Sequence, residues 1–282
     1  MDEYQHEVIA AAAHDPVELK SGTSMQLNQK LNQHFIIKID GVDYVYVYIR
    51  KNACSAWKKV FMAESSHQAE ADKNLRPIEF MNKFHRATSL DAVTAVDRKI
   101  VILRDPVIRV YSAFINQIVM RMDRQYSLHR SIEQVTGKPI GRLNFSEFVN
   151  QYLTKVDPDQ LDGHFQPQHR ALVNIDYSHV WDLSSLHQKS AELLGPAFAD
   201  RYFAKKVNST ERLTKTDERA WDLKIREIAK TYQNDNVVPD IAALIRPETA
   251  EKLRVFYQRD YQLLKTYGLE SVAVNLEIFR SA

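Results

Sequence analysis

The sequence is poor in cysteine, in glycine and in long apolar runs. Of its 282 residues only Cys54 is a cysteine, which excludes a disulfide within the chain and is typical of a reducing compartment. Seven glycines and nine prolines are too few for a fibrous or low-complexity protein. No run of 18 apolar residues occurs, and the apolar run near the N-terminus is too short and wrongly flanked for a signal peptide. We therefore expect a cytoplasmic protein without stable membrane insertion.

A strong charge of one sign is also missing. The 38 Lys and Arg residues nearly balance 36 Asp and Glu residues, which leaves a net charge of +2. Nothing in the overall charge indicates a nucleic-acid partner, so any anion site must come from a local concentration of Lys and Arg. The composition is otherwise that of an ordinary globular protein, and a chain of this length can bury a full core.

Short apolar runs and helical periodicity alternate along the first half of the chain. The run from Gly41 to Arg50 is dense in Val, Tyr and Ile, which is typical of a strand buried on both faces. Apolar residues at helical spacing then predict a helix that begins at Ser55 or Ala56. Lys99 to Leu103 predicts a second strand, and the Asp-Pro pair that follows suits the N-cap and first turn of a second helix.

The second half continues this pattern and ends in helices. Residues 178–195 predict a third strand and helix, and Tyr202 to Val207 predicts a fourth strand. Apolar stripes over 221–232 and 253–264 predict C-terminal helices, with Gly268 as a helix stop. Strands that alternate with helices favour parallel βαβ units. The predicted fold class is therefore α/β, a three-layer α/β/α arrangement with a central, mainly parallel sheet and extra C-terminal helices.

The most informative feature for function is a basic turn between the first strand and its helix. Such a turn points backbone N–H groups at the helix N-terminus, where the helix dipole favours a phosphate or sulfate. Small side chains let the anion approach, a serine hydroxyl can donate to it, and lysines supply charge. The candidate residues are Arg50, Lys51, Asn52, Ala53, Cys54, Ser55, Ala56, Trp57 and Lys58. The alternative is a surface turn with solvated lysines, but an apolar strand leads directly into this one.

The turn differs from the phosphate loop of nucleotide triphosphatases. Both glycines of G-x-x-x-x-G-K-[ST] are missing, and Lys51 is followed by Asn52 instead of a Ser or Thr that would hold magnesium. The sequence therefore disfavours a P-loop nucleotide kinase or phosphotransferase. That enzyme class and a non-catalytic nucleotide-binding module remain alternative functions for a basic turn of this kind.

The segment VYVYIRKNACSAWKKVF resembles the 5′-phosphosulfate loop of carbohydrate sulfotransferases. These enzymes take a sulfuryl group from 3′-phosphoadenosine 5′-phosphosulfate (PAPS), and their loop commonly reads Pro-Lys-x-Ala-Cys-Thr-x-Trp-Lys. The matching residues are Lys51, Ala53, Cys54, Trp57 and Lys58, whereas Arg50 replaces the proline and Ser55 the threonine. The resemblance implies PAPS as donor, a P-loop-like fold and no metal, because a sulfuryl group carries less charge than a phosphoryl group.

A second segment, ILRDPVIRVYSAF, resembles the family's 3′-phosphate motif, Arg-Asp-Pro-x-x-Arg-x-x-Ser-Ala-Phe. The resemblance implies that Arg104 and Ser112 bind the 3′-phosphate, and a guanidinium at a strand end suits phosphate oxygens. Arg109 has an alternative role that we favour, namely an ion pair with Asp105 four residues earlier on the same helix.

Weaker resemblances extend the match to about residues 42–268. DGHFQPQHRAL, from Asp162, resembles a His-aromatic-x-Pro-Gln segment of the family, and VNSTER, from Val207, resembles a segment near the nucleotide, which implies cofactor contacts for Asn208 and Ser209. Residues 1–34 are then an N-terminal arm or short helix and 35–282 a single sulfotransferase domain, with 123–170 as an acceptor-facing helical insertion. The implied acceptor is a saccharide or glycoconjugate, by analogy a bacterial glycan.

In-line sulfuryl transfer develops negative charge on the sulfuryl and bridging oxygens, so positioning and fixed positive charge should supply most of the rate. Lys51 is predicted to stabilise the leaving group. The family's layout puts the catalytic base between the two motifs, where His85 fits best. The alternatives for the base are His67, His164, Glu64 and Glu79.

Overall fold

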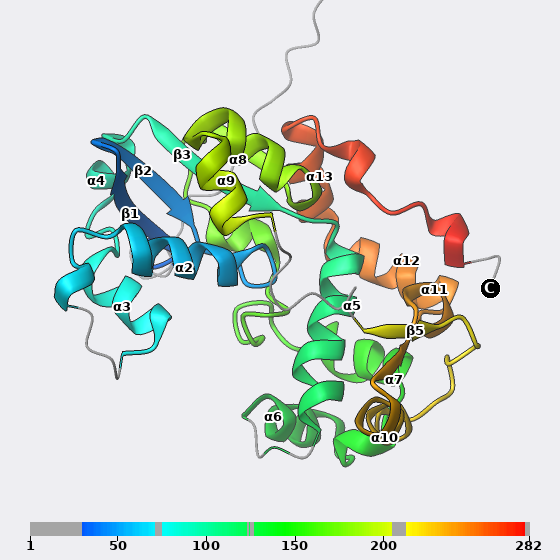
Figure 1. The fold of residues 1–282 in the computed structure, drawn as a ribbon. Helices are drawn as coiled ribbons and strands as arrows, with labels where there is room; N and C mark the ends of the chain where they lie inside the picture. Colours follow the sequence, from blue (N-terminus) through cyan, green and yellow to red (C-terminus); the bar gives the residue numbers. More distant parts are fainter. Residues whose placement is uncertain (1–29, 71–74, 123, 125–126, 205–212, 280–282) are drawn as a thin grey trace, which may run out of the picture.

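The computed structural model describes residues 30–70, 75–122, 124, 127–204 and 213–279. A four-stranded sheet with the order β1-β2-β3-β4 lies at the centre of the first half. The strands are β1 (His34–Ile39), β2 (Val42–Val47), β3 (Arg98–Leu103) and β4 (His179–Asp182). The β1–β2 pair is antiparallel and the other two pairs are parallel, so the predicted mainly parallel α/β sheet is confirmed (Figure 1).

Strand β1 is the part of the sheet that the pattern analysis missed. It joins β2 through a two-residue turn in which Asp40 has φ 49° and Gly41 has φ 81°. Two successive positive φ angles are the geometry of a tight β-hairpin, for which Asp-Gly is a favoured pair. The predicted strand from Gly41 to Arg50 is therefore the second arm of a hairpin, and it ends at Val47.

Each of the three predicted strand–helix units is present. Helix α2 (Cys54–Glu64) follows β2, α5 (Pro106–Gln117) follows β3, and α8 (Leu186–Leu194) follows β4 after a short 3-10 turn. Asp105 caps α5 as predicted, because its carboxylate accepts a 2.8 Å hydrogen bond from the backbone N–H of Ile108. The α2 helix begins at Cys54, slightly earlier than the periodicity indicated.

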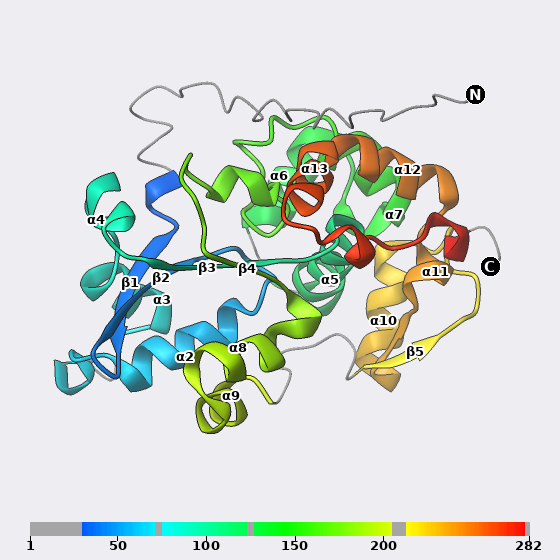
Figure 2. The same cartoon turned by 90° about the horizontal axis from the view of Figure 1, so that it is seen from above.

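The sheet is covered on both faces, which confirms the three-layer arrangement (Figure 2). On one face Tyr46 and Ile102 pack with α2, α8 and α9 (Pro196–Tyr202). On the other face Val101 and Leu103 pack with α13 (Gln258–Thr266). Because side chains alternate along a strand, neighbouring residues of β3 serve the two different layers.

A second core lies among the helices beyond the sheet. Helix α5 packs there with α6 (Ser127–Thr136), α7 (Phe145–Phe148), α10 (Ile225–Asp235) and α12 (Pro247–Phe256). The rings of Phe114 and Phe145 meet edge to face at 4.8 Å. The segment 123–170, which lacks periodicity, contains α6, α7 and the π-helical turn Val149–Leu153 that continues α7, whereas residues 154–167 are turns and bends. Its role towards an acceptor stays a prediction.

Two C-terminal predictions need correction. Tyr202 does not begin a strand, because it is the last residue of α9, and 205–212 lie outside the described residues. The stripe over 253–264 forms two helices, since α12 ends at Phe256 and α13 begins at Gln258. A small parallel pair, β5 (Thr214–Thr216) and β6 (Val237–Pro239), was not predicted.

The other described elements are short. The helices are α3 (Pro77–Phe84), α4 (Leu90–Thr94) and α11 (Ile241–Leu244). The 3-10 turns are Gln68–Glu70, Val119–Arg121, Ile140–Arg142, Gln168–Ala171, Leu183–Ser185, Glu270–Val272 and Leu276–Phe279. Among the helices of the described segments, none has the length and apolar character needed to cross a membrane.

Candidate active site

The basic turn between β2 and α2 has the backbone geometry of an anion site. Lys51 (φ 73°) and Ala53 (φ 57°) both adopt the left-handed conformation, which is uncommon for residues with side chains and concentrates at functional sites. The N–H of Asn52, between them, donates to Ile49 O at 3.2 Å, so the N–H groups that face an anion are those at the start of α2. Ala53 is also the N-cap of the eleven-residue helix α2, cannot cap it with a side chain, and no acidic residue follows in the first turn. An anion is the natural partner for these N–H groups.

Trp57 fixes the orientation of α2 and hence of the turn. Its ring is fully buried and stacks on Tyr46 of β2, with 4.6 Å between ring centroids and 14° between planes. One turn earlier, Cys54 and Ser55 are half-buried at the start of the helix, and Lys58 is half-buried beside Trp57. The residues that resemble the 5′-phosphosulfate loop are thus a rigid strand–turn–helix unit.

Gln168 belongs to the Pro-Gln segment but was not among the predicted site residues, and its side chain joins this turn to the second motif. The buried amide of Asn52 donates to Ile102 O at 2.8 Å and to Gln168 Oε1 at 2.5 Å. The same Gln168 oxygen accepts from the backbone N–H of Arg104 at 3.1 Å, and Gln168 Nε2 donates to Arg104 O at 2.8 Å. The structure therefore brings the turn after β2 and the turn after β3 together through one amide.

Arg109 does not make the predicted ion pair with Asp105. Its guanidinium is 1% exposed and donates to the carbonyl oxygens of Arg50 at 3.0 Å, Gln166 at 2.8 Å and Gly163 at 3.3 Å. The prediction was wrong because the i,i+4 rule describes exposed helix faces. This face of α5 is buried against two turns, and the carbonyl oxygens of those turns accept hydrogen bonds from Arg109.

The Asp105 carboxylate has other partners. Besides capping α5, it accepts from the hydroxyl of Tyr261 and from the backbone N–H of Val274, both at 3.0 Å. Burial raises the pKa of Asp105, and these hydrogen bonds act in the opposite direction. The start of α5 is therefore held by the C-terminal segment as well as by its own cap.

Positive charge gathers around Lys51. Burial lowers the pKa of Lys51 to about 8; Cys54 raises it, and the nearby cations Arg104, Arg109 and Arg121 lower it further. A bound anion would compensate this repulsion. Arg104 is half-buried at the end of β3, and Ser112 is buried on α5. Asn208 and Ser209 lie outside the described residues.

A histidine and an aspartate from the 162–166 turn lie directly beside the loop. Asp162 Oδ1 accepts from the backbone N–H of His164 at 2.9 Å and from its ring Nδ1 at 2.5 Å. Arg50 Nη1 is 3.7 Å from Asp162 Oδ1 and 3.5 Å from His164 Nδ1. Burial lowers the pKa of His164, an effect that Asp162 partly offsets and that Arg50 and Lys51 strengthen.

His85, the residue predicted as base, is buried between α3 and β1. Its Nδ1 donates to Ile36 O at 2.8 Å, so its Nε2 must accept from the Ser65 hydroxyl at 2.7 Å. Both ring nitrogens are therefore engaged, and the ring packs edge to face on Phe61. These contacts give His85 a bracing role, and its catalytic assignment stays a prediction.

The other candidate bases between the motifs are also engaged. Glu64 accepts from the hydroxyl of Tyr202 and lies 3.4 Å from Arg201 Nη1. Glu79 accepts from the backbone N–H of Arg76 at 2.9 Å in a capping box at the start of α3. His67 stacks on the ring of Phe84, with 4.7 Å between centroids. None of these contacts involves the loop residues 50–58.

Residues at the α12–α13 junction hold the backbone of residues 165–169 in place. Asp260, which is fully buried, accepts from the backbone N–H groups of Gln168 at 2.8 Å and His169 at 2.9 Å, and from His169 Nδ1 at 2.7 Å. The hydroxyl of Tyr257 donates to Phe165 O at 2.6 Å. The Pro-Gln segment was visible in the sequence, but nothing local indicated that it meets Tyr257 and Asp260.

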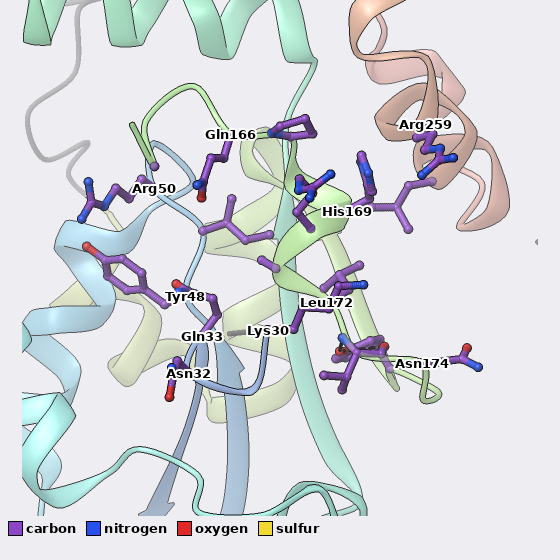
Figure 3. A pocket seen from close by; sticks show the side chains of 18 of the residues that line it. Lys30, Asn32, Gln33, Tyr48, Arg50, Gln166, His169, Leu172, Asn174 and Arg259 are labelled. Carbon is purple, nitrogen blue, oxygen red and sulfur yellow. Dashed lines mark hydrogen bonds between the residues drawn. The ribbon is translucent and has the colours of Figure 1, made fainter. Parts of the chain in front are cut away.

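An open cleft of about 1270 Å³ extends from the loop towards α13 (Figure 3). Arg50 and Gln166 lie at one end of the view, and Asn174 lies at the other. Side-chain amides are frequent on its walls: Asn32, Gln33, Asn82, Gln166, Asn174, Gln258 and Gln262. Among the described residues, no group of three or more His, Cys, Asp or Glu side chains is arranged to hold a metal ion.

Comparison with known proteins gives one match, to a protein family. A family model described as "Sulfotransferase family" matches residues 33–267. No curated protein and no solved structure matches the chain. The matched region covers well over half of the sequence and includes the turn after β2, the turn after β3 and the segment that joins them. The chain therefore belongs to the sulfotransferase family.

Proposed function

We propose that this sulfotransferase moves a sulfuryl group from PAPS to a hydroxyl of a carbohydrate or glycoconjugate. The observation that carries the proposal is the bridge from Asn52 through Gln168 to Arg104. It supports a single binding site in which both turns contact one doubly phosphorylated adenosine, since parallel neighbouring strands present their carboxyl ends at the same edge of a sheet.

The residues fit the two charged ends of such a donor. The uncapped N-terminus of α2, the hydroxyl of Ser55 and the Lys51 ammonium would hold the phosphosulfate, and Arg104 with Ser112 would hold the 3′-phosphate. The donor supplies an activated sulfuryl group. Lys51 would stabilise the negative charge that develops on the leaving phosphate oxygen, because it lies among cations and away from bulk water.

The cleft supports a carbohydrate acceptor. A sugar hydroxyl is both a donor and an acceptor of hydrogen bonds, and the Asn and Gln amides of the walls offer both functions on one planar group. Tyr48 adds an aromatic face next to Arg50 at the loop end. An open cleft of this size suits an extended acceptor, of which one hydroxyl would reach the loop.

The proposal is tested in two steps. Thermal unfolding is measured with adenosine 3′,5′-bisphosphate, AMP and ATP with magnesium; we expect selective stabilisation by the bisphosphate, of about 2.7 kcal/mol at a hundredfold excess over Kd. Release of the bisphosphate from PAPS is then followed across a panel of saccharides. Preference for ATP with magnesium would point to a phosphotransferase, and binding without release would point to a non-catalytic module.

A further inference from the structure

Arg109 fastens the turn that carries His164 to the phosphosulfate loop. A single buried guanidinium binds the carbonyl of Arg50 on one side and the carbonyls of Gly163 and Gln166 on the other. His164 lies between the last two residues, so its backbone is held at a fixed position relative to the loop. The guanidinium uses donors on three separate nitrogens in one plane, a spread that the single ammonium nitrogen of a lysine does not offer.

The contacts of His164 define which ring nitrogen can react. A carboxylate can only accept, so Nδ1 donates to Asp162 at 2.5 Å and cannot also accept from Arg50 Nη1 at 3.5 Å; this tautomer leaves the lone pair on Nε2. No hydrogen bond links Nε2 to any of the described residues, and the side chain is 16% exposed. Arg50 approaches the same carboxylate at 3.7 Å and holds it in place by charge. An aspartate that fixes the tautomer of a histidine is the arrangement of a general base.

The electrostatic surroundings keep His164 ready to accept a proton. Burial and the nearby cations Arg50 and Lys51 lower the pKa of His164 below its ordinary value, although Asp162 acts against them. The imidazole is therefore neutral at pH 7, as a base must be before the reaction. His85 lacks this freedom, because Ser65 and Ile36 engage both of its nitrogens.

We propose that His164 is the catalytic base of the sulfuryl transfer and that Asp162 is its positioning residue; this inference rests on the proposed function. The acceptor O–H bond breaks and its proton moves to His164 Nε2 while the oxygen forms a bond to sulfur. The bond between sulfur and the bridging oxygen breaks, and its electron pair stays on the phosphate of the departing adenosine 3′,5′-bisphosphate. Asp162 stabilises the imidazolium, which returns its proton to solvent.

The test uses the full chain with PAPS and an acceptor found in the screen. We expect His164→Ala to lower kcat by about 10²–10⁴-fold, with the affinity for adenosine 3′,5′-bisphosphate unchanged, and added imidazole to restore part of the rate. Asp162→Asn should lower kcat and move the acid limb of the kcat/KM profile to lower pH, because the histidine loses its carboxylate. A purely structural role would leave that limb in place.

The matched control is another histidine–aspartate pair. His187 and Asp200 are joined at 2.8 Å on the surface of α8 and α9, and we expect His187→Ala and Asp200→Asn to keep wild-type rates and pH profiles. An active wild type with a His164→Ala variant within threefold of its kcat would overturn this inference alone. A wild type that binds the bisphosphate but releases none from PAPS with any acceptor would overturn the proposed function, and this inference with it.

Discussion

Lys51 combines features that rarely occur together in one lysine. It has a left-handed backbone, a half-buried side chain and three arginines within electrostatic reach. Burial and those arginines disfavour its charged form, whereas a bound phosphate or sulfate favours it. A lysine whose pKa lies at about 8 is thus charged fully only when its ligand is present or the pH is low.

This property predicts a pH dependence of ligand affinity. Below pH 8 Lys51 already carries its proton, so binding of adenosine 3′,5′-bisphosphate needs no proton uptake at this group. Above pH 8 the proton must be taken up on binding, so Kd should rise by up to tenfold, about 1.4 kcal/mol, per pH unit. Isothermal titration calorimetry from pH 7 to 9.5 measures this change in Kd.

Two variants test whether Lys51 causes the pH dependence of Kd. Lys51→Arg should show a nearly flat Kd over that range, because guanidinium keeps its charge. Cys54→Ser replaces the neighbouring thiol with a hydroxyl of similar size and should keep the wild-type slope. A slope that vanishes in Cys54→Ser and persists in Lys51→Arg would contradict the assignment.

The buried contacts of His85 predict an effect on the free energy of unfolding. His85→Phe keeps a ring of similar size but leaves Ile36 O and the Ser65 hydroxyl without their imidazole partners. We expect the free energy of unfolding in urea to fall by about 1–3 kcal/mol. Unchanged stability together with a hundredfold lower kcat would instead support His85 as the base.

Between elements, the site depends on contacts that cross long stretches of sequence. Asp260 on α13 holds the backbone of Gln168, and Gln168 in turn holds Asn52 and Arg104. Asp260 lies 92 residues from Gln168 in the chain. The catalytic edge of the sheet is thus positioned by a helix that contributes no residue to either anion motif.

Asp260→Asn should therefore weaken both stability and ligand binding. An amide cannot accept all three of the hydrogen bonds that the buried carboxylate receives, and its NH₂ group would face a backbone N–H. We expect a loss of about 1–3 kcal/mol of unfolding free energy and a higher Kd for adenosine 3′,5′-bisphosphate. The matched control is Asp222→Asn, because Asp222 is 80% exposed and forms a surface ion pair with Arg246. Equal effects of the two substitutions would contradict a supporting role for Asp260.

The same contacts explain what local sequence patterns could predict. Periodicity and capping signals predicted all three strand–helix units, because hydrophobic spacing and the Asp105 cap act within a few residues. The hairpin partner β1 was missed although Asp40-Gly41 offered a turn signal. Arg109 was assigned to Asp105 by a short-range rule, whereas its true partners at 50, 163 and 166 could be found only once the chain had folded. Gln168 had no local signal of its bridging role.

At the scale of the whole molecule, the site lies where two cores meet. Helix α5 of the helical core follows strand β3 of the sheet core directly in the chain, and the 162–169 segment reaches the turn after β2 through Arg109 (Figures 1 and 2). Arg109 and Gln168 join this segment to the loop by hydrogen bonds, and Arg50 adds its contacts with Asp162 and His164. Ordering the loop with a ligand should then order the segment as well, because the two share buried hydrogen bonds.

Hydrogen–deuterium exchange tests this coupling. Adenosine 3′,5′-bisphosphate should slow amide exchange in residues 50–56 and also in residues 162–169, since local opening of either region breaks the same buried contacts. In Asp260→Asn the second region loses its anchor, so the ligand should still protect 50–56 but protect 162–169 far less. Protection confined to 50–56 in the wild type would mean that the two regions open independently. In that case Arg109 would hold the His164 turn too loosely for a base that must meet the acceptor at the loop.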